Sequence, residues 1–398
     1  MISTAEALSI IRANRPMPDV VDTPLEDCVG AVCAQDVPAK VTMPPFDASA
    51  MDGYGVRFED ARKAGRTLTV IGEAPAGSPF EGIVREGQAV RIFTGSPMPG
   101  GTDHVVIQEN VTRTGDDILL TTDAETPRHI RKSGIDFTKG DILVAKDARI
   151  NPAHIALAAS GNHASLPIYR RPRVAILASG DELRSVGSDL KPGQIINSNM
   201  AALKALITHW GGVPIDLGIA RDNLESIAAC IKKAEDADII VPIGGASVGD
   251  YDFMKEAFSI AGFETLFKKI AVRPGKPTWL ARKDGQCVLG LPGNPASAMV
   301  CAHLFLKPLL GAADAQTSRA KLDASVTANG PRETYMRARI HIDNTGALTV
   351  TPFPKQDSSL ITPFVRSNAL IKLPPNSGPW QSGDSIDILP LEVGPDIL

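Results

Sequence analysis

The stretch that decides the fold is Val174–Glu182, which reads VAILASGDE. Its five leading apolar residues are typical of a strand buried on both faces of a parallel sheet, and its last four are small or polar. Two later stretches have the same order of buried strand and glycine-containing loop: Ile239–Asp252 (IIVPIGGASVGDYD) and Val288–Ser297 (VLGLPGNPAS). The sequence therefore predicts one sheet with three polar loops at the carboxyl ends of its strands.

Helical patterns alternate with these strands, and a further strand-like run covers Val213–Ile219. Apolar residues recur at helical spacing in four segments: Met200–Trp210, Leu224–Ala234, Met254–Ala261 and Ala296–Leu310. Strands that alternate with helices are joined by right-handed crossovers, with helices on both faces of the sheet. We therefore expect a doubly wound, mainly parallel α/β domain over residues 172–311.

The regions on either side have a different rhythm. Helix starts at Ser3 and at Asn151-Pro152 flank a series of short β-like runs: Thr67–Ile71, Ala89–Phe93, Val105–Ile107 and Ile118–Thr121. This arrangement predicts a helical stem over 1–44 and 146–171 that carries an inserted small β domain over 45–145. After 311 we expect a small C-terminal β barrel or sandwich over 312–398, from four alternating runs: Ala338–Ile342, Leu348–Thr351, Ala369–Leu373 and Ser385–Leu389.

Composition narrows the functional classes. The 398 residues carry a net charge of −4, are 5% aromatic and contain no long basic stretch, which argues against nucleic acid and anionic membranes as partners. The five cysteines form no C-x-x-C pair, so reduced thiols are expected. The start of the chain does not resemble a signal peptide, and no run of about 18 apolar residues exists. We therefore expect a cytoplasmic protein.

The three loops are the first candidates for chemistry, because ligands of parallel α/β sheets bind beyond the carboxyl ends of the strands. Glycine lets backbone N–H groups approach an anion closely, so the loops suit phosphate, although helix capping is the structural alternative for each loop alone. There is no Walker sequence and no G-x-G-x-x-G fingerprint. The candidate binding residues are Ser179, Gly180, Asp181, Gly244, Gly245, Ser247, Gly249, Pro292, Gly293, Asn294 and Pro295.

Carboxylates accompany these loops, at Asp181, Glu182, Asp250 and Asp252. Acids beside a phosphate site are understandable if Mg²⁺ bridges them, since magnesium prefers oxygen ligands shared between carboxylate and phosphate. Capping and solvation are the alternative. We therefore take Asp181, Glu182 and Asp252 as candidate magnesium ligands.

The loop Arg273–Pro277 (RPGKP) carries the opposite charge. Two prolines and a glycine restrict its backbone, so Arg273 and Lys276 are presented with little loss of entropy. Arginine grips an oxyanion with two parallel hydrogen bonds, whereas lysine acts as a point charge. A solvated turn is the alternative, but a preorganised cationic loop after an apolar strand favours oxyanion binding.

Other patterns are weaker. The β region contains a dense run at Pro44–Tyr54, a strand that ends in Thr94-Gly95, and basic residues before Asp136. The seven histidines show no zinc-ligand spacing, and no G-x-S-x-G elbow supports a serine hydrolase.

Taken together, six signatures resemble one family, the molybdopterin molybdenumtransferases of the MoeA type, related to the E domain of gephyrin. They stand in the family's order along almost the whole chain: Phe46–Tyr54 (FDASAMDGY), Arg91–Gly95 (RIFTG), Ser179–Leu183 (SGDEL), Gly244–Gly249 (GGASVG), Pro274–Pro277 (PGKP) and Leu291–Pro295 (LPGNP). Each signature alone is weak, but six in order are specific. Departures from the family pattern include Arg273, where many relatives have lysine, and Ala246, where a larger valine is common.

The resemblance implies a homodimer whose protomer has a helical stem, an inserted β domain, a molybdopterin-binding α/β domain and a C-terminal β barrel. The site would lie between the α/β domain of one subunit and the stem and β domain of its partner. The resemblance places Asp52, Thr94, Arg131 and Asp136 on the partner's side. On the side of the α/β domain it places Glu182, Asp222, Asp252, Arg273, Lys276, Pro292 and Pro295, with Gln356–Ser359 at the border; Glu182, Asp52, Asp136, Asp222 and Asp252 would be catalytic.

The implied reaction is insertion of molybdate into adenylylated molybdopterin, with release of AMP, in molybdenum-cofactor biosynthesis. Magnesium would be the cofactor, and molybdopterin adenylyltransferase and the enzymes that receive the cofactor are possible protein partners. Three alternatives stay open: molybdopterin adenylyltransferase activity, a gephyrin-like scaffold, and tungstate as the preferred oxyanion.

Overall fold

The computed structural model describes residues 1–17, 19–244, 253–311 and 317–392. The chain forms two compact units: unit 1 comprises Met1–Asp19 and Arg170–Leu398, and unit 2 comprises Val20–Tyr169. Each unit is described by itself below.

The centre of unit 1 is a six-stranded mixed sheet with the order β16-β13-β17-β21-β20-β18. Its strands are β13 (Arg173–Ser179), β16 (Val213–Ala220), β17 (Ile239–Ile243), β18 (Glu264–Phe267), β20 (Trp279–Lys283) and β21 (Gln286–Gly290). The strands β16, β13, β17 and β21 are parallel, whereas β20 runs antiparallel to both of its neighbours, β21 and the edge strand β18. The mainly parallel α/β domain predicted from the alternating pattern is therefore confirmed.

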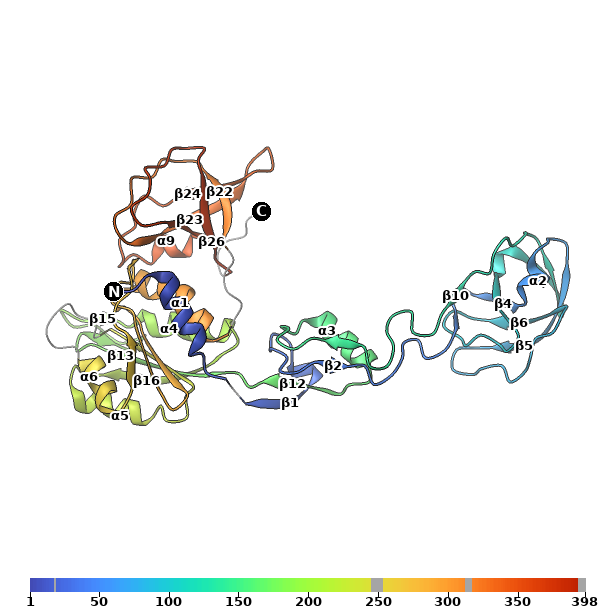
Figure 1. Cartoon of the computed structure of the whole chain (residues 1–398), viewed down its shortest axis with the longest axis horizontal. Helices are drawn as coiled ribbons and strands as arrows, with labels where there is room; N and C mark the ends of the chain where they lie inside the picture. Colours follow the sequence, from blue (N-terminus) through green and yellow to red (C-terminus); the bar gives the residue numbers. More distant parts are fainter. Residues whose placement is uncertain (18, 245–252, 312–316, 393–398) are drawn as a thin grey trace. The chain divides into compact units, whose positions relative to one another are not determined.

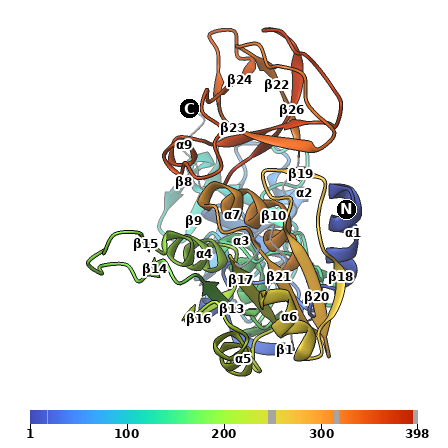
Figure 2. The same ribbon diagram turned by 90° about the vertical axis from the view of Figure 1, so that its left-hand side faces the viewer.

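Helices cover both faces of this sheet (Figures 1 and 2). One face packs on α4 (Ser198–His209) and on the helix that runs through α7 (Pro295–Cys301), a π-helical turn (Ala302–Leu306) and α8 (Lys307–Leu309). The opposite face packs on α5 (Leu224–Lys232) and α6 (Phe253–Ile260). Because both faces are covered, β13 and β17 are almost wholly apolar, as expected for interior parallel strands.

The first helix, α1 (Thr4–Ala13), belongs to unit 1, although we expected residues 1–44 in the stem. Its N-cap is Ser3, whose hydroxyl accepts a hydrogen bond from the amide of Glu6 (3.1 Å). The reason for the difference is packing: Ala7 and Ile11 are fully buried in the same core as α4 and α7. The capping signal thus predicted the helix, but not the core that it joins.

The C-terminal part of unit 1 is a closed barrel (Figure 2). Its strands are β22 (Ser318–Leu322), β23 (Glu333–Ile342), β24 (Leu348–Pro352), β25 (Ala369–Leu373) and β26 (Ser385–Pro390). The pairing β23-β24-β22-β26-β25 returns to β23, so the ring has no free edge. A short strand from the α/β part, β19 (Val272–Arg273), adds to β23, and one short helix, α9 (Thr362–Val365), lies within this region.

Unit 2 contains both strand pairs of the stem and a β domain. The stem has β1 (Val20–Pro24), β2 (Val37–Pro38), β11 (Ile142–Val144), β12 (Ser165–Tyr169) and α3 (Pro152–Ser160), so it is not only helical. Asn151 caps α3 and Pro152 opens it, as the sequence predicts. The β domain has the sheet order β7-β4-β6-β5-β9-β8, from β4 (Gly53–Val56), β5 (Thr67–Ala74), β6 (Gln88–Ile92), β7 (His104–Ile107), β8 (Val111–Thr114) and β9 (Asp117–Leu120).

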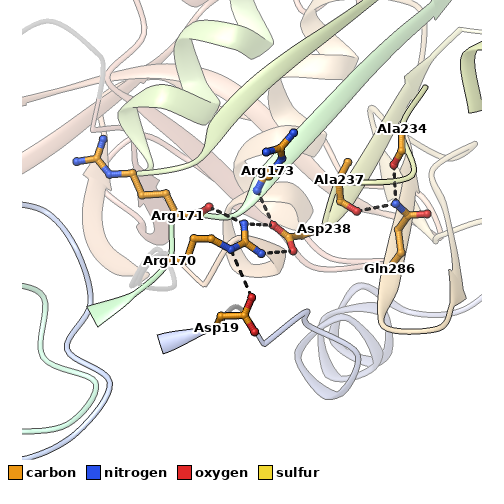
Figure 3. A network of polar contacts seen from close by, with 8 residues as sticks. All are labelled: Asp19, Arg170, Arg171, Arg173, Ala234, Ala237, Asp238 and Gln286. Carbon is orange, nitrogen blue, oxygen red and sulfur yellow. Dashed lines mark hydrogen bonds and ion pairs between the residues drawn. The ribbon is translucent and has the colours of Figure 1, made fainter. Parts of the chain in front are cut away.

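The chain leaves and re-enters unit 1 at a polar network around Asp238 (Figure 3). Arg170 binds both oxygens of Asp238, at 3.0 and 2.9 Å, and the amide of Arg173 donates to the same carboxylate (2.6 Å). Asp19 joins the network through its own ion pair with Arg170 (3.8 Å). Among the described residues, no helix is long and apolar enough to span a membrane.

Candidate functional site

Three strands of the unit 1 sheet deliver their loops to one place, as predicted. The loops follow β13, β17 and β21, which are parallel neighbours in the order β13-β17-β21. Gly244 ends β17 with φ of +86°, and a Cβ placed there would lie 2.8 Å from the carbonyl oxygen of Ser179. A Cβ on Gly293 would in turn lie 3.5 Å from the Cα of Gly244. The loops therefore approach each other through backbone atoms, and glycine is required for the contact at Gly244.

The described residues of these loops line a cleft of about 710 Å³. Nine of the predicted residues line it: Ser179, Gly180, Glu182, Asp222, Gly244, Pro292, Gly293, Asn294 and Pro295. The predicted border residue Ser359 also contributes, from the C-terminal part of unit 1. A cleft of this size lies within the usual range of small-molecule binding sites.

Two carboxylates lie in the cleft. The Glu182 side chain folds back over its own loop, so that a Cβ on Gly180 would lie 2.8 and 2.9 Å from the two carboxylate oxygens. The buried hydroxyl of Ser179 donates a hydrogen bond to Asp222. The segment that ends β13 and follows it therefore contacts both acids: Glu182 lies over Gly180, and Asp222 is hydrogen-bonded to Ser179.

Some predicted residues fall elsewhere. The side chain of Asp181 is exposed and does not line the cleft, while its carbonyl accepts a hydrogen bond from Arg184 (2.9 Å). The cause is local geometry, since the turn after β13 brings Glu182 rather than Asp181 over Gly180. The remaining predicted residues Gly245, Ser247, Gly249 and Asp252 lie outside the described residues.

The start of α4 forms a further wall that our sequence analysis did not identify. Asn197, Ser198 and Asn199 line the cleft; Asn197 caps the helix by accepting from the amide of Met200 (3.3 Å). Asn199 donates to the carbonyl of Gly293 (2.7 Å), which connects this helix to the loop after β21. The N-terminus of a twelve-residue helix supplies free N–H groups and a favourable field for an anion. The signal in the sequence was an Asn cap, which is common at helices of any function.

The cationic loop lies beside the cleft. Arg273 and Lys276 line a second hollow of about 560 Å³, which shares Pro277, Pro292 and Asn294 with the first. Both charged side chains are exposed, whereas Gly275 between them is buried. The loop thus presents two exposed cations at the hollow next to the cleft, and their role in oxyanion binding stays a prediction.

The segment Gln356–Ser359 borders both hollows, and a buried arginine organises it. Arg337, only 3% exposed, donates to the carbonyls of Asp357 (2.9 Å) and Leu360 (2.5 Å), and its amide donates to the side chain of Gln356 (3.0 Å). The segment is tied to the loop after β21 because Asn294 donates to the hydroxyl of Ser358 (3.0 Å). Arg337 was missed because a single arginine in a β pattern looks like a solvent-facing residue.

In unit 2, the predicted residues gather on three interlocked loops. The amide of Gly95 donates to the carbonyl of Ser49 (2.8 Å), and the amide of Ala50 donates to that of His129 (2.8 Å). Asp52 accepts from the amide (2.7 Å) and the hydroxyl (2.9 Å) of Thr94. These two donors, the amide first, lower the pKa of Asp52 below its usual value, so the exposed carboxylate is ionised at neutral pH.

The same loops carry the other acids and cations of unit 2. Asp47 accepts from Lys132 (2.7 Å) and from the amide of Ser133 (2.9 Å), and Lys132 is the main reason that the pKa of Asp47 is lowered. Arg131 lies on β10 (Ile130–Arg131), opposite Ala48 on β3 (Ala48–Ser49), and is exposed. Asp136 is exposed five residues later. Asp52, Thr94 and Arg131 thus share one loop cluster, whereas the amide of Asp136 donates to the carbonyl of Met43 (3.2 Å).

The donor set near the cleft bears on magnesium. Within the described ranges, no three His, Cys, Asp or Glu side chains lie close enough to hold a metal ion by themselves. Magnesium is usually held by one or two carboxylates together with substrate phosphates, and Glu182 and Asp222 both line the cleft. The residues present therefore fit a magnesium ion that is bound jointly with a phosphate ligand.

Comparison with protein-family models covers most of the chain. Residues 2–161 match the MoeA N-terminal region (domain I and II). Residues 175–312 match a probable molybdopterin binding domain, and residues 319–391 match the MoeA C-terminal region (domain IV). The cleft described above lies in the second and third of these regions, and the unit 2 loop cluster lies in the first.

Full-length relatives agree with these matches. The molybdopterin molybdenumtransferase of Haemophilus influenzae is 34% identical and covers 98% of both chains, and that of Bacillus subtilis is 34% identical over 92% of this chain and 88% of the relative. The crystal structure of a MoeA molybdopterin biosynthesis protein from Pyrococcus horikoshii matches with a TM-score of 0.85 and 30% identity, covering 98% of this chain and 99% of the other. With the cleft, the cationic loop and all three family regions in agreement, this chain belongs to the MoeA family of molybdopterin molybdenumtransferases, the enzymes of molybdenum-cofactor biosynthesis.

Proposed function

We propose that the cleft of unit 1 binds adenylylated molybdopterin, and that the protein inserts molybdate into it with release of AMP. The observation that carries this proposal is the meeting of Ser179–Glu182, Gly244 and Pro292–Pro295 at a cleft large enough for a nucleotide-linked pterin, with the cationic loop at the adjoining hollow. The two anionic substrates would therefore bind at neighbouring positions.

The diphosphate of the substrate binds at the loop backbone. Ser179, Gly180 and Gly244 are close to one another, and the start of α4 adds free N–H groups on the same cleft. Molybdate binds at Arg273 and Lys276, whose exposed side chains lie in the adjoining hollow. Holding both reactants in one place lowers the entropic cost of their encounter, so the protein acts mainly by positioning and by electrostatic stabilisation.

Glu182 and Asp222 would hold magnesium together with the substrate phosphates. When bound, the ion would neutralise phosphate charge and polarise the phosphoanhydride. The carboxylate of Glu182 lies over Gly180, and Asp222 accepts a hydrogen bond from Ser179, so both acids line the cleft. The two dithiolene thiols of molybdopterin would lose their protons and form two Mo–S bonds, while one molybdate oxygen leaves as water. A water molecule would cleave the phosphoanhydride, so that AMP leaves and the phosphate stays on molybdopterin.

The first experiment measures AMP release from adenylylated molybdopterin with magnesium, in the presence and absence of molybdate. Molybdate-dependent AMP release, together with formation of active cofactor, is the expected result. Adenylylation of free molybdopterin driven by ATP would instead favour the adenylyltransferase alternative and contradict the proposal. Replacing molybdate by tungstate in the same assay decides which oxyanion is preferred.

We further propose that the chain acts as a homodimer in which Asp52, Thr94, Arg131 and Asp136 of one subunit serve the cleft of the other. The support is chemical: Asp52, Thr94 and Arg131 form one exposed loop cluster with an ionised acid at Asp52, and Asp136 is a further exposed acid close by in the sequence. These residues lie far from the cleft residues in the sequence. A site shared between two subunits, which the family resemblance implies, would explain how both sets serve one reaction.

Subunit mixing tests this arrangement. Glu182→Ala and Asp52→Ala are each expected to be inactive, and the two are then mixed under conditions that exchange subunits. If the site combines two chains, random mixing makes about half of the dimers mixed, each with one intact site, so about a quarter of the activity returns. No recovery, with exchange verified by mass spectrometry, would show that each chain supplies both residues to its own site.

A further inference from the structure

A buried cluster on the interior side of the cationic loop contacts its backbone. The residues of this cluster have no part in the proposed function above. Arg273 and Lys276 are exposed, but Gly275 between them is buried and points its backbone into the protein. A Cβ on Gly275 would lie 2.2 Å from the Cys301 sulfur, so the loop backbone rests directly on this side chain. Glycine at φ of +116° is therefore required for this contact as well as for the turn.

Thr278 completes the contact. Its side chain is fully buried, and its hydroxyl donates to the carbonyl of Gly275 (2.8 Å), while its amide donates to the same oxygen (3.0 Å). The hydroxyl also lies 3.3 Å from the Cys301 sulfur. Burial raises the pKa of Cys301 to about 12, so the thiol stays protonated at neutral pH. This pair is inert in reactivity and acts through packing and hydrogen bonding.

Cys301 belongs to the helix that begins directly after the loop following β21. Helix α7 starts at Pro295, and Asn294 just before it lines both hollows. Cys301 ends α7 and is fully buried, with its sulfur within 4.0 Å of the carbonyl of Pro274. One rigid helix therefore connects a wall of the substrate cleft to the underside of the cationic loop.

From this connection we propose that Cys301 and Thr278 are positioning residues, which fix the cationic loop at a set distance from the Pro292–Pro295 loop and thereby set the affinity for molybdate. The inference rests on the proposed molybdate site at Arg273 and Lys276. The two charged ends of the loop are held by other means, because Arg273 pairs with β23 and the carbonyl of Lys276 accepts from the amide of Ile270 (3.1 Å). The Thr278–Cys301 pair beneath Gly275 therefore fixes the position of the backbone turn between Arg273 and Lys276.

The test is the isosteric variant Thr278→Val, which keeps volume and removes the hydroxyl. We expect its KM for molybdate to rise about tenfold, the effect of one lost hydrogen bond on a binding loop, with the KM for adenylylated molybdopterin unchanged. Saturating molybdate should restore kcat. A titration of molybdate by calorimetry should show the same weakening without turnover. Cys301→Ala should act in the same direction, and Thr278→Ser, which retains the hydroxyl, should behave like the unmodified protein.

Two matched controls separate positioning from general loss of stability. Thr4→Val makes the same change at a buried threonine of α1, whose hydroxyl has no partner among the described residues. Cys287→Ala removes a buried thiol of the same core, which donates to the carbonyl of Asn14 (2.9 Å). Both should leave the KM for molybdate unchanged.

The outcomes are distinguishable from failure of the proposed function. If the unmodified protein shows no molybdate-dependent AMP release, the proposed function fails first. If it does, but Thr278→Val and Cys301→Ala both bind molybdate normally, or raise the KM of both substrates equally, the positioning role is wrong. Should Thr278→Val fail to fold, the comparison of Cys301→Ala with Cys287→Ala decides the question in the same way.

Discussion

The cleft of unit 1 and the loop cluster of unit 2 are built by different physical means. In unit 1, backbone atoms approach each other closely: Gly244 lies against the carbonyl of Ser179, and Gly293 lies against Gly244. In unit 2, an acidic side chain organises the loops, as Asp52 accepts two hydrogen bonds from Thr94.

This difference predicts different sensitivity to mutation. In the cleft, an added Cβ should disturb the structure, because glycine conformations and close backbone approaches have no substitute, and loss of an acid that faces the substrate should stop the reaction. A cluster tied by side-chain hydrogen bonds in water should lose function in small steps, since each exposed hydrogen bond contributes little. The predictions below test this contrast from the largest expected effect to the smallest.

The largest effect is expected for Glu182→Ala in the cleft. Loss of a carboxylate that faces the reacting phosphates should lower the rate of transfer by about a thousandfold, while the unfolding temperature stays the same. Molybdate-dependent AMP release is measured for the variant and for Glu235→Ala, which removes an exposed acid just beyond the C-terminal end of α5 and outside the cleft. Normal turnover in Glu182→Ala would refute its catalytic assignment.

A pH series compares the two units through one buried histidine in each. Burial is the main reason that the pKa of His104 in unit 2 and of His303 in unit 1 is lowered to about 4, from an ordinary 6.5. In the unfolded chain each imidazole takes up a proton more readily than in the folded protein. The contribution of each neutral histidine to the unfolding free energy is therefore fully present above pH 6.5 and is lost as the pH falls toward 4. Each contributes up to about 3 kcal/mol to this loss.

Calorimetric unfolding between pH 7.5 and 4.5 measures this effect. His104→Gln and His303→Gln should each flatten the pH dependence of the unfolding free energy, and the double variant should flatten it further. A variant that lowers stability equally at all pH values would show that its histidine does not titrate in this range.

Gly244→Ala breaks the backbone contact of the cleft. It adds a Cβ 2.8 Å from the Ser179 carbonyl, at a φ of +86°. The matched control is Gly218→Ala, at a similar φ of +81° but with open space around the added Cβ. Both should lose about 1 kcal/mol for the left-handed conformation, and only Gly244→Ala should lose about 2 kcal/mol more, with weaker nucleotide binding. Equal denaturation curves for the two variants would show that the loop relaxes without cost.

The smallest effect is expected for Thr94→Val in unit 2. It removes the hydroxyl that donates to Asp52 but keeps the amide donor, so kcat/KM should fall by roughly threefold to tenfold. Thr69→Val on β5 is the control, because it breaks a similar hydrogen bond, from Thr69 to Asp117 of β9 (2.9 Å), in the same unit. A loss as large as that of Glu182→Ala would mean that Thr94 itself contacts the reacting groups.

Local patterns in the sequence determined much of this protein. Apolar runs predicted β13 and β17, and parallel strands necessarily deliver their loops to one edge, so Ser179, Gly180 and Gly244 could be placed together without a structure. The capping residues Ser3 and Asn151 predicted two helix starts correctly. These successes share one reason: each depends on residues that are close in sequence.

Tertiary structure alone decided the rest. No local pattern shows that Ala7 and Ile11 pack in the α/β core, that Asn199 reaches the carbonyl of Gly293, or that Arg337 turns inward to hold Asp357 and Leu360. Nor does a local pattern show that Gly275 contacts Cys301, which lies 26 positions later in the sequence. Such contacts arise when separate elements close around a common core, because burial energy depends on which surfaces meet and not on their order in the chain.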